Sequence, residues 1–391
     1  MKAKSNMIVF DGLKGLMLLA TIGLFWNKGQ SLNGMVASFS LVALAGFTGA
    51  YYWEHRGSGV AFRSRQVMWQ TWLNLLWLTC VTAIAFLILD YSHLVAINWQ
   101  LASGVLLIGN FHQATLHPDS LLVNAGLNGV AHLWYFAVFA QVAAVLSVVA
   151  WSFDKLRLSN LNKSIAWLAS MVVLSLIAGG LAASGIGLHL VEWFCYAISA
   201  MSGIVLVYLL PYALNALYAT VHKQYWYLLI GSVSIVVLGV VLTSVTIQGP
   251  QDLFLYGGLI NLATAGAIFT VVAGLPLARK ILEFPLLVAM GRRLGSLYMS
   301  YIFTAIWLGH LDVTLQWVIG IVMAELWYWF FVKGLPPVLF INSPSWGEAY
   351  DVLWQDLQTK QLNTLHIASS LVALLLVLLG AATLAVSFIV M

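Results

Sequence analysis

Residues 165–185 read IAWLASMVVLSLIAGGLAASG, a run of 21 positions without a charged side chain. A helix rises about 1.5 Å per residue, so a run of this length spans the roughly 30 Å hydrocarbon core of a bilayer. A helix also satisfies its backbone hydrogen bonds within the segment, which lipid demands because it supplies no partners. The stretch therefore predicts a transmembrane helix.

Ten more apolar stretches of this kind lie on either side of it. They cover residues 7–27, 33–53, 68–90, 131–151, 189–214, 226–246, 254–277, 295–309, 313–333 and 366–390. The stretch 295–309 is short and needs polar flanks to complete a crossing. We expect an all-α polytopic membrane protein with about eleven transmembrane helices.

The composition of the 391-residue chain agrees with this expectation. Only 8% of the residues are charged and 62% are hydrophobic, whereas soluble domains carry about a quarter charged residues. Such a chain cannot be a soluble domain, a disordered protein, a collagen, a disulfide scaffold or a nucleic-acid binder. Cys80 and Cys195 both lie inside apolar runs, so we interpret them as small buried hydrophobes.

The basic residues orient the helices. With the N-terminus in the cytoplasm, 15 of the 17 Lys and Arg residues fall inside, provided that the interrupted stretch 94–110 does not cross. A full crossing there would turn every later basic cluster outward. We therefore predict that 94–110 is a re-entrant segment, with the N-terminus inside and the C-terminus outside.

The segment 338–365 is the longest polar connection, and it precedes a last helix within 366–391. Four residues within it recur with helical spacing: Tyr350, Leu353, Trp354 and Leu357. Both an amphipathic helix on the cytoplasmic membrane face and an ordinary packed loop helix fit this pattern. No internal repeat or soluble domain is evident.

Charged residues at membrane depth need a partner or a function. Asp11 and Lys14 share one face of the first helix, so either they pair with each other or Lys14 faces a cavity for an anionic ligand. Two arginine pairs at the inner ends of helices either anchor the topology or bind phosphates of a cytoplasmic ligand: Arg63 with Arg65, and Arg292 with Arg293.

Other ionisable residues carry weaker signals. His132 stands beside aromatic residues at an outer helix end, where a membrane-belt role is the more common one. Glu192 begins one span and Glu325 lies deep within another, as the deepest carboxylate without an evident partner. The spacing of His112, His117 and Asp119 matches no established ligand pattern, so no metal is expected.

Six segments, taken in order, resemble the acyltransferase-3 family of integral membrane O-acyltransferases, which includes peptidoglycan O-acetyltransferases. They are 11–16 (DGLKGL, against the family's DGLRGL), 46–47 (GF, against SGF), 62–65 (FRSR, a basic run before the third helix), 132–141 (HLWYFAVFAQ, against HLWSLAVEEQF), 291–298 (GRRLGSLY, against GRISYSLYLWHWP) and 324–333 (AELWYWFFVK, against AELSYRFIEKP). The resemblance implies an acyltransferase-like membrane domain over residues 1–337.

The resemblance implies transfer of an acyl group from cytoplasmic acetyl-CoA or another acyl-CoA to a cell-envelope glycan, without a metal. Candidate donor-binding residues are Lys14, Arg63, Arg65, Arg292, Ser296 and Tyr298. The family's arginine and histidine on the first helix correspond to Lys14 and Phe25, and a phenyl ring cannot carry a proton. Other ionisable family positions hold Phe139, Ala140, Tyr301 and Val332, whereas His132 and Gln141 are retained.

This pattern predicts an acyltransferase-like scaffold with impaired or lost catalysis. The alternative is a non-catalytic pseudoenzyme that regulates or scaffolds cell-wall enzymes. Relatives with a fused extracytoplasmic SGNH domain carry it on an extra last helix, and 366–390 resembles that helix without such a domain following. We therefore expect a multi-pass protein of a bacterial cytoplasmic membrane, surrounded by lipid, with an SGNH-type or cell-wall partner protein and no nucleic acid.

Overall fold

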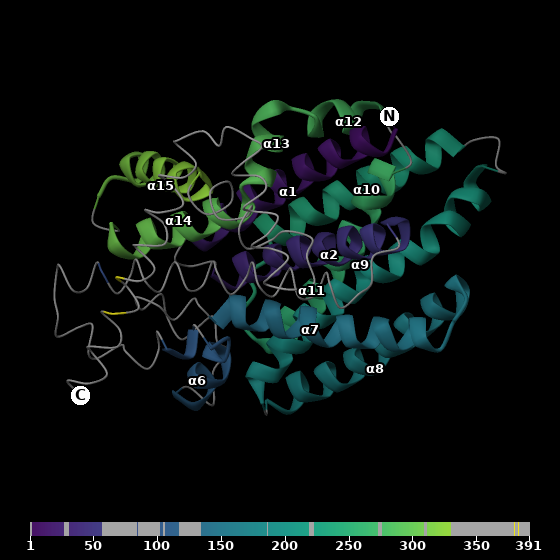
Figure 1. The fold of residues 1–391 in the computed structure, drawn as a ribbon, viewed down its shortest axis with the longest axis horizontal. Helices are drawn as coiled ribbons and strands as arrows, with labels where there is room; N and C mark the ends of the chain where they lie inside the picture. Colours follow the sequence, from purple (N-terminus) through teal and green to yellow (C-terminus); the bar gives the residue numbers. More distant parts are fainter. Residues whose placement is uncertain are drawn as a thin grey trace, which may run out of the picture. The chain divides into compact units, whose positions relative to one another are not determined.

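A computed structural model describes twelve helices of the chain (Figure 1). The described residues are 2–26, 31–56, 84, 102–104, 106–116, 134–185, 187–218, 223–272, 276–308, 311–329, 379 and 382. The helices are α1 (Lys2–Trp26), α2 (Ser31–Arg56), α6 (Gly109–Leu116), α7 (Trp134–Lys155), α8 (Asn160–Ser184), α9 (Leu188–Tyr218), α10 (Lys223–Thr243), α11 (Pro250–Val272), α12 (Pro276–Leu282), α13 (Pro285–Arg292), α14 (Leu294–Trp307) and α15 (Val313–Trp327).

The described part of the chain contains only helices and connections, which confirms the all-α prediction. Within it, five stretches are long and apolar enough to cross a membrane: Gly34–Tyr51, Ala137–Lys155, Asn160–Ser184, Leu188–Tyr212 and Pro250–Val272. The chain is thus a membrane protein. The expected spans 68–90 and 366–390 and the polar connection 338–365 lie outside the described residues, apart from the three isolated positions 84, 379 and 382. The number of eleven spans therefore stays a prediction.

The chain forms two compact units. Helices α1, α2 and α7 to α13 belong to the first unit, together with α6 from Asn110 onward. The second unit contains α15, and α14 from Gly295 onward. The expected domain boundaries at residues 337 and 365 lie outside the described residues.

Helices α2 and α9 pack with their backbones in close contact. A Cβ atom at Gly46 would collide with the carbonyl oxygen of Ala200, and one at Gly203 would collide with that of Ala43. Small residues allow such an approach, and in lipid close packing replaces the hydrophobic effect as the main source of helix association. The pair α2 and α9 therefore forms the centre of the first unit, where Phe39 and Tyr196 meet edge to face with ring centroids 4.9 Å apart.

Helix α1 packs in the same way against α12 and α13. Cβ atoms at Gly12 and Gly15 would collide with the carbonyl oxygens of Leu282 and Leu287, and one at Gly291 would collide with that of Asp11. The sequence did not reveal the two short helices, because α12 and α13 have only 7 and 8 residues. Each begins with a proline, whose missing N–H costs nothing in the first turn of a helix.

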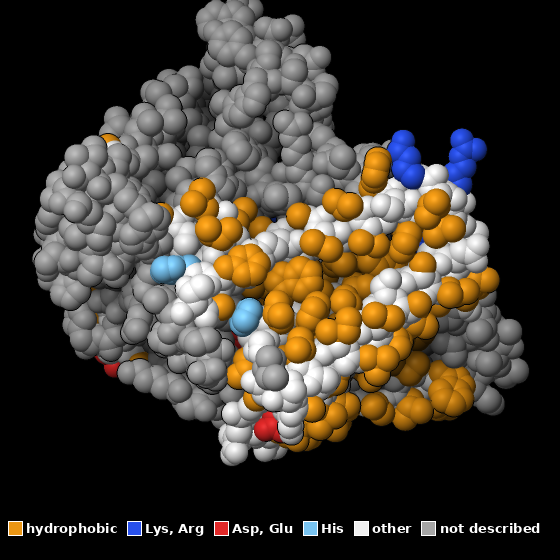
Figure 2. Space-filling model, turned by 90° about the horizontal axis from the view of Figure 1, so that it is seen from below, with side chains coloured by type: hydrophobic (Ala, Val, Ile, Leu, Met, Phe, Trp, Pro, Cys, Tyr) orange, Lys and Arg blue, Asp and Glu red, His pale blue; other side chains and the backbone are white. Residues whose placement is uncertain are grey.

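Helices α7 and α8 leave much of their apolar surface unburied. Only 17% of the α8 span is buried within the protein, against 61% for the α9 span. Figure 2 shows hydrophobic side chains crowded over one face of the molecule, with Lys and Arg side chains at one end of that face. The distribution fits a helix pair that faces acyl chains.

The interrupted stretch 94–110 breaks within its described part. The amide of Leu107 donates to Gly104, and that of Ile108 donates to Ser103, so the helical path ends in a turn before α6 begins. Leu107 has a φ of 60°, which an L-residue rarely adopts. A continuous helix through this point is therefore excluded, and the re-entrant path remains a prediction.

The glycine contacts of α1 can be tested with two alanine substitutions on the same helix. Gly15→Ala places a methyl group against the carbonyl oxygen of Leu287, whereas nothing lies within 4 Å of a Cβ atom at Gly23. We expect Gly15→Ala to lower the melting temperature in detergent, and Gly23→Ala to raise the free energy of unfolding by up to about 1 kcal/mol. Equal effects of the two variants would contradict the close approach of α1 and α13.

The start of α15 predicts a local pH dependence in the second unit. Asp312 caps the helix by accepting a hydrogen bond from the amide of Thr314 at 2.9 Å, and hydrogen bonding from Thr314 lowers the pKa of its carboxyl group below the ordinary 3.8. The cap is therefore fully effective above the ordinary pKa and is lost as the pH falls through the lowered value. Hydrogen exchange should show protection of the first turn of α15 decreasing in acid, whereas Asp312→Asn should keep its protection because asparagine caps without a charge.

Candidate functional site

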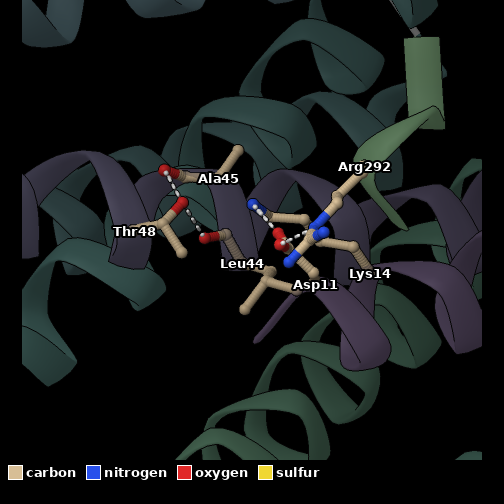
Figure 3. A network of polar contacts seen from close by, with 6 residues as sticks. All are labelled: Asp11, Lys14, Leu44, Ala45, Thr48 and Arg292. Atoms are coloured by element: carbon tan, nitrogen blue, oxygen red, sulfur yellow. Dashed lines mark hydrogen bonds and ion pairs between the residues drawn. The ribbon is translucent and has the colours of Figure 1, made fainter. Parts of the chain in front are cut away.

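Three charged side chains from α1 and α13 meet in the first unit (Figure 3). The Arg292 Nε atom donates to Asp11 Oδ2 at 3.2 Å, and the Lys14 Nζ atom lies 3.6 Å from Asp11 Oδ1. The two cations thus contact different oxygens of the Asp11 carboxylate. Of the two alternatives for Lys14, pairing with Asp11 is observed, and the sequence did not reveal Arg292 as the closer partner.

Local structure explains why these side chains meet. Asp11 and Lys14 lie one helical turn apart, and Gly12 and Gly15 follow them on the helix. Gly12 lies against the end of α12, whereas Gly15 and Gly291 allow α13 to approach so closely that its last residue, Arg292, reaches Asp11. A basic residue at the last position of a helix is also favourable for the helix dipole. The motif DGLKGL therefore provides both the contact surface and the charges.

The cluster retains positive charge and open donors. Asp11 is 19% exposed, Lys14 28% and Arg292 52%. Two cations share one carboxylate, and no described residue accepts a hydrogen bond from the terminal nitrogens of Arg292. The glycine contacts already bring α1 and α13 together, so the charges are not the main source of that packing. The chemistry of the cluster instead suits an anion, because a guanidinium fork matches two phosphate oxygens.

Neighbouring polar groups do not join this cluster. Arg293 directs its Nη1 atom to the carbonyl oxygen of Ala289 at 3.4 Å, on its own helix. The Thr48 hydroxyl group turns back to the carbonyl oxygens of Leu44 and Ala45, at 2.9 and 3.3 Å. In Figure 3, the dashed contacts of Thr48 accordingly stay on its own helix. Arg292 is thus the member of the arginine pair that faces the charge cluster.

The segment 46–47 also contacts the first helix. The ring of Phe47 lies 5.2 Å from that of Phe10 between centroids, and Phe47 is fully buried. Gly46 lies against Ala200, as described above. Three of the six segments that carry the family resemblance (11–16, 46–47 and the start of 291–298) therefore lie on helices that touch α1 or belong to it.

A second polar cluster connects α6, α7 and α9. The side-chain amides of Asn110 and Gln141 exchange two hydrogen bonds, at 3.0 and 2.9 Å. The indole N–H of Trp193 donates to the same Gln141 oxygen at 3.2 Å. In the sequence, only the family resemblance had pointed to Gln141 as a candidate site residue. Its partners lie 31 and 52 positions away in the chain, where no local sequence pattern could point to them.

Other predicted site residues lie outside the described part of the chain or in the second unit. Arg63, Arg65 and His132 lie outside the described residues, as does the side chain of Phe25. Ser296 and Tyr298 are buried in the second unit, with 4% and 6% of their surfaces exposed.

The positions at which the family carries ionisable residues are packed as apolar ones. Ala140 is 1% exposed and Phe139 is half-buried on α7. Tyr301 is 6% exposed and packs against Trp317, with ring centroids 5.5 Å apart. These side chains pack between helices. At these positions the family carries ionisable residues, whereas this chain has residues that contribute to packing.

The two carboxylates singled out within predicted spans differ in their burial inside the protein. Glu192 has no exposed surface, whereas Glu325 is only half-buried. The start of a span appears shallow in a linear map, but neighbouring helices of a bundle can cover it completely. Among the described residues, no group of three His, Cys, Asp or Glu side chains could hold a metal ion. His117 and Asp119 lie outside them.

No family model, curated protein or solved structure matches the chain.

The amide cluster predicts a destabilised variant. Gln141→Leu removes the partners of both Asn110 and Trp193, and the buried amide of Asn110 then lacks its bonds. We expect a loss of about 1–2 kcal/mol in the free energy of unfolding in detergent micelles. Ser147→Ala is the matched control on α7, because Ser147 bonds only the carbonyl oxygen of Ala143 on its own helix. A loss of equal size in both variants would show that Gln141 does not join the helices.

Proposed function

We propose that this membrane protein binds the phosphates of an acyl-CoA through Lys14 and Arg292, as a relative of the acyltransferase-3 proteins with impaired or lost catalysis. The observation that carries the proposal is the ion-pair cluster itself. It joins residues 281 positions apart that belong to two different segments of the family resemblance. On the predicted topology, this cluster lies toward the cytoplasm, where acyl-CoA is found.

The geometry of the cluster suits a ligand with several phosphates. Arg292 is half exposed and engages Asp11 through Nε, and no described residue accepts a hydrogen bond from its two terminal nitrogens. Lys14, on the neighbouring helix α1, adds a second positive charge. Charge-assisted hydrogen bonds of this kind are about twice as strong as neutral ones. A nucleotide-like phosphate group therefore has both a fork and a point charge to bind.

The loss of catalysis is proposed from the chemistry of Phe25. Acyl transfer to a hydroxyl group needs a base that takes the proton of that hydroxyl. The resemblance places the family's histidine at residue 25, and phenylalanine cannot act as a base there. Ala140 and Tyr301 are also buried, at positions where the family carries ionisable residues. Their packing is a second reason to propose that catalysis is lost.

A second candidate function is that of a non-catalytic protein that regulates or scaffolds cell-envelope enzymes. It is favoured by the same apolar replacements at Phe25, Phe139, Ala140 and Tyr301. An SGNH-type or other cell-wall enzyme is the proposed partner, in a bacterial cytoplasmic membrane. The two functions differ in whether acyl-CoA is bound at all.

Binding of acetyl-CoA to the purified protein in lipid nanodiscs tests the proposal. We expect Lys14→Gln and Arg292→Gln each to weaken binding by about tenfold, because each removes a charge-assisted phosphate contact. Asp11→Asn should have the opposite effect and strengthen acetyl-CoA binding by a few-fold, because it removes the carboxylate that competes for both cations. Arg279→Gln is the control, since Arg279 is paired with Glu283 at 2.6 Å.

Three outcomes separate the two functions. Binding without transfer of a radiolabelled acetyl group supports an acyl-CoA-binding protein without catalysis. Binding with transfer would contradict the proposed loss of activity. Absence of both binding and labelling would remove the acyl-CoA hypothesis and leave the scaffold.

A further inference from the structure

The connection between α7 and α8 contains an arginine in a backbone conformation that usually belongs to glycine. Helix α7 ends in a Schellman motif: the amide of Arg157 donates to Asp154, and the amide of Leu158 donates to Phe153. Arg157 therefore occupies the left-handed position after the helix, with a φ of 51°. The next helix, α8, ends with Gly185 at the equivalent left-handed position, with a φ of 69°.

An arginine at this position is unfavourable for the backbone. A Cβ atom in the left-handed region crowds the neighbouring carbonyl group, so glycine is the better residue there. The helix dipole does not require Arg157, because Lys155 already supplies a cation in the last turn. A strained position that persists on the surface is grounds to look for a function of its side chain.

An ion pair and a cation–π contact hold the turn, and neither of them involves Lys155 or Arg157. Lys163 at the start of α8 lies 2.6 Å from Asp154 at the end of α7, and its ammonium group lies 5.8 Å from the ring of Tyr208 on α9. Asp154 is thus engaged by the buried lysine. Lys155 and Arg157 are both exposed, and no described residue forms an ion pair with either of them. The two cations are presented by a preorganised turn.

Large apolar side chains surround these cations. Leu156, between Lys155 and Arg157, is 69% exposed, and Trp151, one turn earlier, is 48% exposed. The Lys155 ammonium group lies 5.6 Å from the centre of the Trp151 ring. Leu161 and Ile165, at the start of α8, are also exposed. Tryptophan and leucine beside exposed cations are typical of side chains at the boundary between headgroups and acyl chains.

We propose that the α7–α8 turn binds the phosphate headgroup of an anionic phospholipid through Lys155 and Arg157, with Leu156 and Trp151 against its acyl chains. The turn lies at the end of the helix pair whose surface is mostly open to lipid. Figure 2 shows Lys and Arg side chains at one end of a hydrophobic face of the molecule. A soluble phosphate would fit the cations but would leave the exposed apolar side chains unused. This site does not depend on the acyl-CoA proposal, because it shares no residue with it.

The test compares stability and lipid binding in nanodiscs of phosphatidylcholine alone and of phosphatidylcholine mixed with phosphatidylglycerol. Arg157→Gly relieves the left-handed arginine, so in phosphatidylcholine we expect its melting temperature to rise by about 1–3 °C. The same variant should bind phosphatidylglycerol roughly fivefold more weakly, as measured by native mass spectrometry. Lys155→Gln should lose a similar factor, whereas Arg279→Gln, whose cation is paired with Glu283, should lose none.

Each outcome decides the proposal. A lower melting temperature of Arg157→Gly in phosphatidylcholine would show that the arginine serves the fold, and would overturn the inference. Unchanged phosphatidylglycerol binding in both charge variants would overturn it as well. A third arm adds soluble glycerol phosphate: failure to compete with the lipid supports a lipid site, and full competition would replace it with a soluble phosphate site.

Discussion

The close contact between α1 and α13 is the constraint on which the candidate site depends. Gly15 on α1 and Gly291 on α13 lie where any side chain would collide with a backbone carbonyl group of the facing helix. Only this approach lets Arg292 at the end of α13 reach Asp11 on α1. Such packing is suited to a bilayer, where lipid is as apolar as leucine and helices associate through close fit. The same short segment of α1 carries the glycines and the charged residues, so the packing contact also positions the charges.

The same principle orders the rest of the first unit. Gly46 and Gly203 bring α2 and α9 together, and Gly257 of α11 would place a Cβ atom 2.9 Å from the ring of Phe39. Polar side chains inside these spans mostly bond within the protein. Serine and threonine hydroxyl groups return to carbonyl oxygens of their own helices, as for Thr21 and Met17 at 2.8 Å. Gln141 is different, because its amide joins three helices, which makes it a specific link between them.

The sequence predicted the long helices well, because a helix that spans lipid needs a long run of apolar residues. Stretches such as 189–214 correspond to a helix over Leu188–Tyr218, with ends shifted by a few residues. The short helices α12 and α13 escaped prediction because their lengths are too small for a periodic signal. The Asp11–Lys14 pair was foreseeable from helical spacing, whereas Arg292 was not, because no local pattern specifies a contact across 281 residues. The complete burial of Glu192 could not be predicted for a related reason, because burial within a bundle depends on neighbouring helices.

The two groups of exposed cations differ in what the fold requires of them. At the α1–α13 contact, glycines carry the packing, and the partly exposed ion pairs add little to stability. At the α7–α8 turn, the fold would be served better by glycine than by Arg157, whose φ is 51°. In neither place does packing explain the positive charge, which leaves anchoring of the membrane topology and binding of an anion as its explanations. The predicted cytoplasmic side offers two kinds of phosphate, in soluble nucleotides and in lipid headgroups. A half-exposed guanidinium beside a carboxylate suits the first kind, and cations flanked by exposed Leu156 and Trp151 suit the second.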